Sequence, residues 1–153
     1  MHNISIKEYL KINGKYYTTP HGDSMWPLLH NKKDAICVVS VNGRLKKHDV
    51  ALYIRSNGQY VLHRVMKVCP DSYVMCGDSQ FKLEPGIKDD QVIGRLDGFY
   101  RGEKFHTVRD FGYKLYVTVW CISPNLRKIL MKIVGYFENK KLKKQKGKKD
   151  EKV

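Results

Sequence analysis

The stretch His-Gly-Asp-Ser-Met-Trp-Pro-Leu-Leu, residues 21–29, is the part of the chain around which the other segments are arranged. Gly22 removes a side chain directly before Asp23 and Ser24, and Pro27 fixes its own φ and restricts the residue before it. A serine in such a turn has an exposed hydroxyl and neighbouring backbone N–H groups outside any β-ladder. A nucleophile and its oxyanion site need both. The residues fit equally well a glycine- and proline-punctuated loop in which the serine has no role.

Segments with the character of β-strands lie on both sides of this stretch. Turn residues such as Asn42-Gly43 and Pro70-Asp71-Ser72 separate them. Residues 60–68 alternate cleanly, which predicts that His63 and Arg64 point to opposite faces of their strand. The predicted strands are residues 15–19, 35–41, 50–54, 60–68, 73–76 and 91–101. Short strands at this spacing predict a mainly β fold, an antiparallel, barrel-like domain.

Helical patterns are expected at the two ends of the chain. Residues 4–12 form a short amphipathic pattern that Asn13-Gly14 ends. From residue 113 to residue 134 apolar side chains recur at helical spacing, and Pro124 can begin a second helix there. We favour packing of these C-terminal helices on the β domain. The alternative is an interfacial helix with its apolar face on a membrane and its lysines near the headgroups.

The chain has 153 residues and a formal net charge of +14, unevenly distributed. Its length fits one domain with its own core. We expect a catalytic domain over residues 1–110, a packed helical segment over 111–137 and a tail over 138–153. The tail holds eight lysines against three acidic residues, which predicts a disordered, solvated segment. The open alternative is a tail that binds an anionic surface, a membrane or nucleic acid.

The four cysteines show neither a CxxC pair nor a Cys/His ligand spacing. Each lies among apolar residues, so we expect reduced, buried thiols and no metal or other cofactor. The N-terminal pattern lacks the uninterrupted apolar core of a signal peptide, and no apolar run is long enough for a transmembrane helix. These features predict a cytoplasmic protein.

A base for Ser24 is expected at His63, in the strand sequence Val-Leu-His-Arg-Val. Gly77-Asp78 closes the following strand. If these strands pair, the Asp78 carboxylate is expected to orient the imidazole and stabilise the imidazolium. Glu84 is a second carboxylate within reach of the same loop, and Lys67 is a weaker alternative base.

With these residues placed, the chain resembles the serine peptidase clan of signal peptidases and LexA-type self-cleaving repressors. Five segments carry the resemblance in order, from about residue 18 to residue 101: GDSMWPLL, KKHDVALY, YVLHRVMKV, GDSQ and VIGRLDGFY. The resemblance implies that Ser24 is the nucleophile. It places His63-Arg64 where the endoplasmic-reticulum and archaeal branch has its histidine base, and Gly77-Asp78 at that branch's Gly-Asp-Asn motif. It also implies a coiled β-sheet barrel.

The chain departs from this pattern at four points. Ser79 replaces the asparagine after Gly-Asp, Glu84 replaces the second aspartate, and no N-terminal transmembrane helix precedes the domain. Gly22 stands where a serine hydroxyl could help the oxyanion hole, so that hole must rely on backbone N–H groups, most simply that of Ser24. The resemblance is also to short bacterial members of the clan that lack a membrane anchor.

The resemblance implies a serine-type endopeptidase that cleaves a leader or signal segment from a peptide or protein. Met25 and Trp26 are weak candidates for the walls of its substrate pockets. Peripheral contact with a membrane is compatible with this function, and no specific nucleic acid is expected. The alternatives are an inactive member that only binds peptides and a module that binds anionic surfaces through the basic tail.

Overall fold

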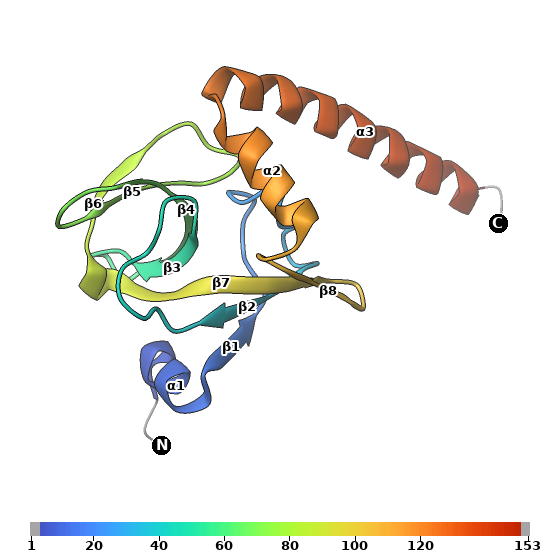
Figure 1. The fold of residues 1–153 in the computed structure, drawn as a ribbon. Coiled ribbons are helices and arrows are strands. Elements are labelled where there is room, and N and C mark those ends of the chain that lie inside the picture. The colour runs from blue at the N-terminus through green and yellow to red at the C-terminus, as the bar shows by residue number, and fades with distance from the viewer. Residues whose placement is uncertain (1–3, 151–153) are drawn as a thin grey trace.

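The computed structural model describes residues 4–150, with side chains as far as Lys143. A short helix, α1 (Ile6–Asn13), precedes the strands, and two helices, α2 (Phe111–Cys121) and α3 (Pro124–Asp150), follow them (Figure 1). The strands are β1 (Lys15–Thr18), β2 (Ala35–Val39), β3 (Val50–Ile54), β4 (Tyr60–Val68), β5 (Tyr73–Cys76), β6 (Glu84–Ile87), β7 (Val92–Arg101) and β8 (Lys104–Thr107). A 3₁₀ turn, η1 (Asp89–Gln91), leads into β7.

The eight strands form one antiparallel sheet in the order β1-β2-β7-β3-β4-β5-β6, with β8 paired to β7. The predicted mainly β, antiparallel character is therefore confirmed. Strands β1 and β6 lie at opposite ends of this order, so the ladder is open across the described residues. The Asn42-Gly43 turn does not close a hairpin, because β2 pairs with β1 and β7 rather than with β3.

Two strands that the sequence did not reveal are β6 and β8. Pro85 and Gly86 are typical of a loop, yet residues 84–87 pair with β5 at the edge of the sheet. An edge strand tolerates proline because one side of its backbone needs no ladder partner. Strand β8 is the return arm of a hairpin that turns at Gly102.

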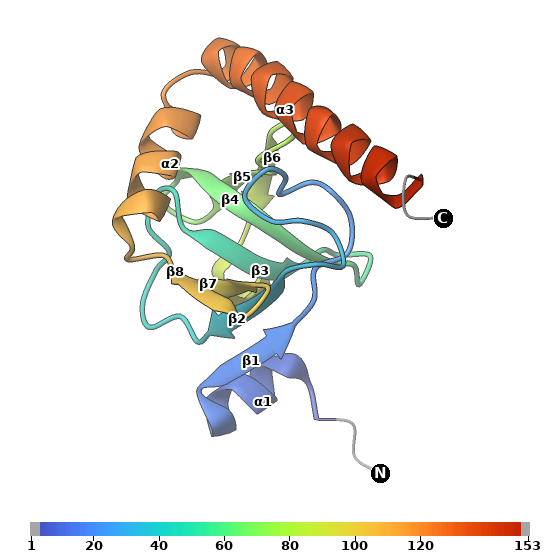
Figure 2. The same ribbon diagram turned by 90° about the vertical axis from the view of Figure 1, so that its right-hand side faces the viewer.

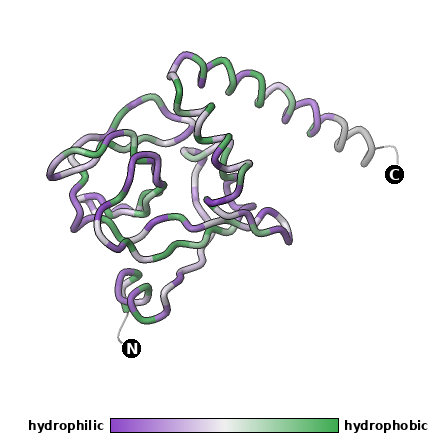
Figure 3. The backbone as a smooth tube through the Cα atoms, viewed as in Figure 1, coloured by the Kyte–Doolittle hydropathy of each residue, from purple (hydrophilic) through white to green (hydrophobic). Residues whose placement is uncertain are grey.

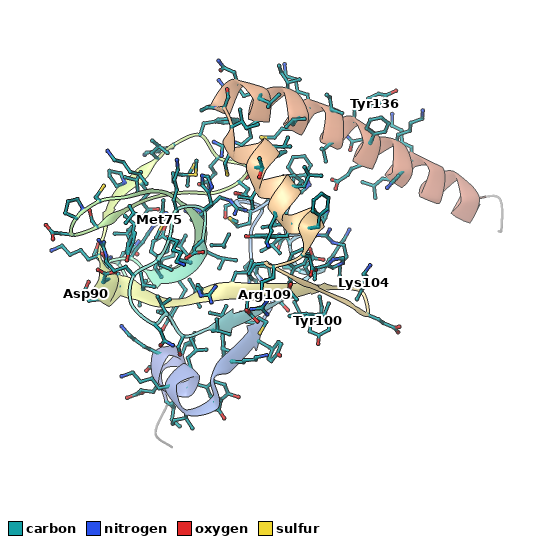
Figure 4. All side chains as sticks on the ribbon, viewed as in Figure 1. Met75, Asp90, Tyr100, Lys104, Arg109 and Tyr136 are labelled. Atoms are coloured by element: carbon teal, nitrogen blue, oxygen red, sulfur yellow. The ribbon has the colours of Figure 1, made fainter. Side chains whose placement is uncertain are left out.

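Both faces of the central strand β3 are buried, so the protein has two apolar clusters. Val50 and Leu52 belong to a cluster with Leu10 of α1 and with Met25, Leu28 and Leu29 of the loop between β1 and β2. Ala51 and Tyr53 point the other way, into a cluster with Val65, Tyr73 and Met75. Figure 4 labels Met75, which is fully buried within the curve of the sheet. Alternation along a strand buried on both sides accounts for this arrangement.

Helix α1 ends where the sequence predicts and begins at Ile6, two residues after the start of the predicted pattern. Ser5 caps it, with its hydroxyl accepting from the Glu8 backbone and the Glu8 carboxylate accepting from the Ser5 backbone. Gly14 ends it in the left-handed conformation. In Figures 1 and 2, α1 lies at the end of the molecule opposite α3.

The tail differs from its prediction. Instead of a disordered segment from residue 138, α3 continues to Asp150, and residues 151–153 lie outside the described part of the chain. The Glu138 carboxylate accepts a hydrogen bond from the Trp26 indole N–H and lies 3.0 Å from His30 Nε2, and lysine is a good helix former, so the helix persists beyond its packed turns. No helix within the described residues is long and apolar enough to span a bilayer.

Candidate active site

Ser24 and His63 line one cleft of about 450 Å³. The wall near Ser24 comes from the loop between β1 and β2, and the wall near His63 comes from the first residues of β4. The remaining lining is mixed, with apolar side chains beside the polar residues Thr18, Thr19, His21, Asp23, Arg55, Gln59 and Gln80. The apolar lining residues are Ile6, Tyr16, Met25, Leu29, Ile36, Leu52, Tyr60, Val61 and Leu62. The structure therefore brings the predicted nucleophile and base into one concave site.

The loop that carries Ser24 is held by its own backbone and by residues 77–79. Gly22 has a φ of +89°, a conformation that favours glycine, and its N–H donates to Asn31 at 3.2 Å. Trp26 N–H donates to the Asp23 carbonyl at 3.0 Å, which closes a turn around Ser24. Within the described residues, the Ser24 N–H donates no hydrogen bond to the backbone. It is therefore available to a developing oxyanion.

Residues Gly77 to Ser79 clamp the Ser24 loop from the far side. Ser79 N–H donates to the Ser24 carbonyl at 2.9 Å, and the Ser79 hydroxyl donates to the Asp23 carbonyl at 2.7 Å. A Cβ atom on Gly77 would stand 2.5 Å from the Ser24 carbonyl oxygen, so only glycine permits this approach. The Gly-Asp-Ser motif thus fixes the backbone of Ser24.

Asp78 does not contact His63 in the way the sequence suggested. Its carboxylate accepts two hydrogen bonds from the Arg64 guanidinium, at 2.7 and 2.6 Å, and one from Tyr116 at 2.9 Å. Strands β4 and β5 do pair as expected, but in a register that places Arg64 opposite Cys76. Because side chains alternate, Asp78 shares the face of Cys76 and Arg64, and His63 points to the other face.

The Arg64–Asp78 pair is completely buried and serves to dock α2. Both side chains are at most 1% exposed. Tyr116 and Trp120 of α2 reach the same aspartate, Tyr116 through its hydroxyl and Trp120 by donating from its indole N–H to the Asp78 carbonyl at 3.0 Å. Charge-assisted bonds of this kind keep a buried pair satisfied.

The partners of His63 are instead Tyr53 and Glu84. The imidazole Nδ1 lies 3.2 Å from the Tyr53 hydroxyl and 3.7 Å from a Glu84 carboxylate oxygen. The Tyr53 hydroxyl donates to Glu84 at 2.7 Å. The ladder registers explain the meeting, because Ala51 lies opposite His63 and Tyr53 is two residues further along the same face.

These contacts assign the tautomer of His63. The hydroxyl of Tyr53 has one hydrogen, and that hydrogen is directed to Glu84. Towards His63 the Tyr53 oxygen can then only accept, so Nδ1 carries the imidazole proton. The other ring nitrogen, Nε2, consequently has the free lone pair that a general base needs.

Burial lowers the pKa of His63 below its usual value, although the negative charge of Glu84 acts in the opposite direction. The neutral imidazole is therefore favoured. Glu84 itself is held in the carboxylate form, since hydrogen bonds from the Arg55 guanidinium at 2.6 Å lower the pKa of Glu84 despite its partial burial. Within the described residues, no hydrogen bond joins Ser24 Oγ to His63. In enzymes, a bond of this kind often tightens only when a ligand is bound.

The remaining candidates occupy different positions. Met25 lines the cleft and is buried, whereas Trp26 points to α3, where its indole N–H donates to Glu138 at 3.0 Å. Lys67 is exposed further along β4 and is not part of the cleft. No group of three or more His, Cys, Asp or Glu side chains with metal-binding geometry occurs in the described part of the chain.

Tyr53 and Arg55 are the site residues that sequence reasoning missed. Their alternation in Val-Ala-Leu-Tyr-Ile-Arg marks them as one face of a strand. Nothing in that pattern, however, shows which strand lies beside β3.

No protein-family model matches this chain, and neither the curated proteins nor the solved structures contain a significant match to it.

Proposed function

We propose that this protein is a serine endopeptidase of the signal peptidase type, working in the cytoplasm on a leader or signal segment of a peptide or protein. The observation that carries the proposal is the shared cleft of Ser24 and His63, in which the contacts of Tyr53 and Glu84 leave His63 Nε2 free to accept a proton. All four cysteines are free, which suits a reducing compartment. We also propose that the sheet forms the coiled barrel that the resemblance to signal peptidases implies.

In the proposed reaction, the Ser24 hydroxyl oxygen attacks the scissile carbonyl carbon while His63 Nε2 takes the hydroxyl proton. The carbonyl oxygen becomes an oxyanion that the Ser24 N–H stabilises. As the C–N bond breaks, His63 gives its proton to the departing amine and an acyl ester remains on Ser24. Water, deprotonated by His63, then hydrolyses this ester and restores the serine.

The roles of the two carboxylates in this proposal differ from those expected from the sequence. Glu84 stabilises the imidazolium from 3.7 Å and holds Tyr53, which in turn holds the imidazole. Asp78 acts through the backbone, because Arg64 and α2 occupy its carboxylate while its neighbours clamp the Ser24 loop. The proposed apparatus is therefore Ser24, His63, Tyr53 and Glu84.

The lining of the cleft supports a peptide substrate in an extended conformation. A trough between a loop and the start of a strand, lined by both apolar and polar side chains, suits alternate side chains of an extended chain, with backbone hydrogen bonds along it. Apolar residues before the cleaved bond are the chemistry that this lining favours.

The experiment that tests the proposal is labelling by a fluorophosphonate probe, read by intact-mass spectrometry, together with digestion of a peptide library. One adduct is expected on the native protein and on Ser56→Ala, a control at an exposed turn serine, and none on Ser24→Ala. His63→Ala should also lose the adduct. Absence of both labelling and cleavage in the native protein would contradict the proposal and favour a binding-only protein.

A further inference from the structure

Over Pro124 to Lys143, where its side chains are described, helix α3 presents two different faces, and only the inner one contacts the rest of the protein. On the inner face, Glu138 accepts from Trp26 at 3.0 Å and contacts His30 Nε2 at 3.0 Å. Arg127, 4% exposed, lies 4.8 Å from the ring centre of Phe81. Figure 2 shows the loop between β1 and β2 beneath this helix. The inner face is therefore anchored to the loop that carries Ser24.

The opposite face carries an exposed stripe, which we define as Ile129, Ile133, Tyr136 and Phe137. These four side chains are 57%, 47%, 63% and 56% exposed. Their spacing of four, three and one residues places them within about a quarter of the helix circumference. Tyr136 stands on the open side of α3 in Figure 4. Large apolar side chains concentrated in this way on a solvent-exposed face mark an interaction surface.

The charges around the exposed stripe are almost all positive. Between Pro124 and Lys143 the helix has six basic residues and a single acidic one, Glu138, which is turned inward. Lys132 and Lys140 flank the stripe, and further lysines follow it in the sequence. Figure 3 shows hydrophobic and hydrophilic residues alternating along this helix. The outer face is thus apolar in the middle and basic at its margins.

We propose that the outer face of α3 binds the surface of an anionic lipid bilayer. Aliphatic and aromatic side chains of a surface helix insert at the boundary of headgroups and acyl chains, while lysines meet lipid phosphates. Tyr and Phe are suited to this depth. A second copy of the chain is a poorer partner, because two faces with the same excess of lysine repel each other.

The contacts of Phe81 place the cleft next to the inner side of α3. Phe81 and Leu83 are 41% and 53% exposed, and Phe81 lies beneath Arg127 and Lys128 of α3. Gln80, their neighbour in the same loop, lines the cleft. A protein bound through α3 therefore holds its cleft close to the bilayer, separated from it by the thickness of the helix, about 10–12 Å. A substrate cut near the membrane surface follows only if the proposed peptidase function holds, whereas lipid binding does not depend on it.

The test is co-sedimentation of the full-length protein with phosphatidylcholine vesicles, with and without phosphatidylglycerol. The decisive variant combines Ile133→Glu with Phe137→Glu. Its matched control combines Ile4→Glu with Ile12→Glu, two exposed residues at the opposite end of the molecule. Circular dichroism checks that both variants remain folded.

Native protein and control are expected to bind phosphatidylglycerol vesicles at least about tenfold more tightly than neutral vesicles, and binding should weaken as salt is added. The Ile133→Glu/Phe137→Glu variant should lose at least about tenfold in affinity. Equal binding by variant and control would overturn the proposal, as would the absence of binding to anionic vesicles. A dimer in solution that the variant dissociates would instead make this face a contact between two copies.

Discussion

His63 is buried, neutral and bonded through Nδ1, and each of these properties depends on a neighbouring side chain. Burial disfavours the imidazolium, while the Glu84 carboxylate at 3.7 Å favours it. Since burial is the larger effect, His63 keeps the deprotonated Nε2 at a pH below the ordinary histidine value. Peptidase activity, where His63 is the base, should accordingly extend below about pH 6.5.

Replacing Glu84 by Gln should lower the pKa of His63 further. The substitution removes the negative charge that favours the imidazolium and leaves the positive charge of Arg55 without its partner. The measurement is an NMR titration of the His63 ring, which needs no activity. Glu103→Gln, at an exposed carboxylate of the β7–β8 turn, is the control and should leave the titration unchanged. An unchanged or raised pKa of His63 in Glu84→Gln would contradict the assignment.

Tyr53→Phe should reduce kcat by roughly 10- to 100-fold with little change in KM, because Tyr53 orients the base and does not line the cleft. Steady-state kinetics on a cleaved peptide measure the effect. Tyr60→Phe, at an exposed ring that lines the cleft, is the control for loss of a tyrosine hydroxyl. A rise in KM with kcat preserved would show that Tyr53 acts on substrate binding instead.

At the scale of elements, the turn after β5 couples the sheet to the loop that carries Ser24. Gly77 and Ser79 contact the backbone of Asp23 and Ser24, while Asp78 between them is held by Arg64 of β4 and Tyr116 of α2. One short segment thus connects β4, α2 and the loop that carries Ser24.

Gly77→Ala should displace the Ser24 loop. The added methyl group would meet a backbone carbonyl at 2.5 Å, which cannot rotate away as a side chain could. We expect a loss of about 1–3 kcal/mol in the free energy of unfolding and loss of labelling at Ser24. Gly112→Ala is the control, since nothing lies within 4 Å of its Cβ position, and it should be neutral or stabilising by up to about 1 kcal/mol. Native labelling and stability in Gly77→Ala would contradict the clamp.

For the molecule as a whole, stability should decrease on acidification in two pH ranges. Burial lowers the pKa of His48 and His63, so the unfolded chain binds more protons than the folded one below about pH 6.5. Hydrogen bonds that outweigh burial hold the pKa of Asp34 and Glu138 below its usual value, and the Arg55 hydrogen bonds do the same for Glu84. Stability from these carboxylates is complete above their unfolded pKa and is lost as pH falls below about 4.5.

Thermal unfolding from pH 8 to pH 3 measures this dependence. The double variant His48→Gln/His63→Gln should remove the fall of Tm in the upper range and keep the fall in the lower one. A Tm that stays constant, or rises, as pH falls from 7 to 5 in the native protein would contradict the burial of neutral histidines.

Much of the fold could be predicted from residues with strong local preferences. Gly14 ends α1, Pro124 begins α3, and alternation in residues 60–68 gave β4 its observed bounds. The failures were segments in which tertiary contacts override local preference. Strand β6 forms across Pro85 and Gly86 because β5 offers it a partner, and α3 continues past residue 138 because Glu138 contacts Trp26 and His30.

The sequence by itself determined the residue types of the candidate site, the alternation of its strands and the two helical ends. Only the tertiary structure decided which side chains the carboxylates of Asp78 and Glu84 contact. Asp78 and Glu84 are both near His63 along the chain, but the register of β4 and β5 turns Asp78 to Arg64, while Glu84 reaches Tyr53 and His63. Strand pairing is set by burial and by the ladder across distant segments. A shift of one residue in the pairing of two strands moves every side chain of the shifted strand to the opposite face of the sheet. The local sequence does not specify that pairing.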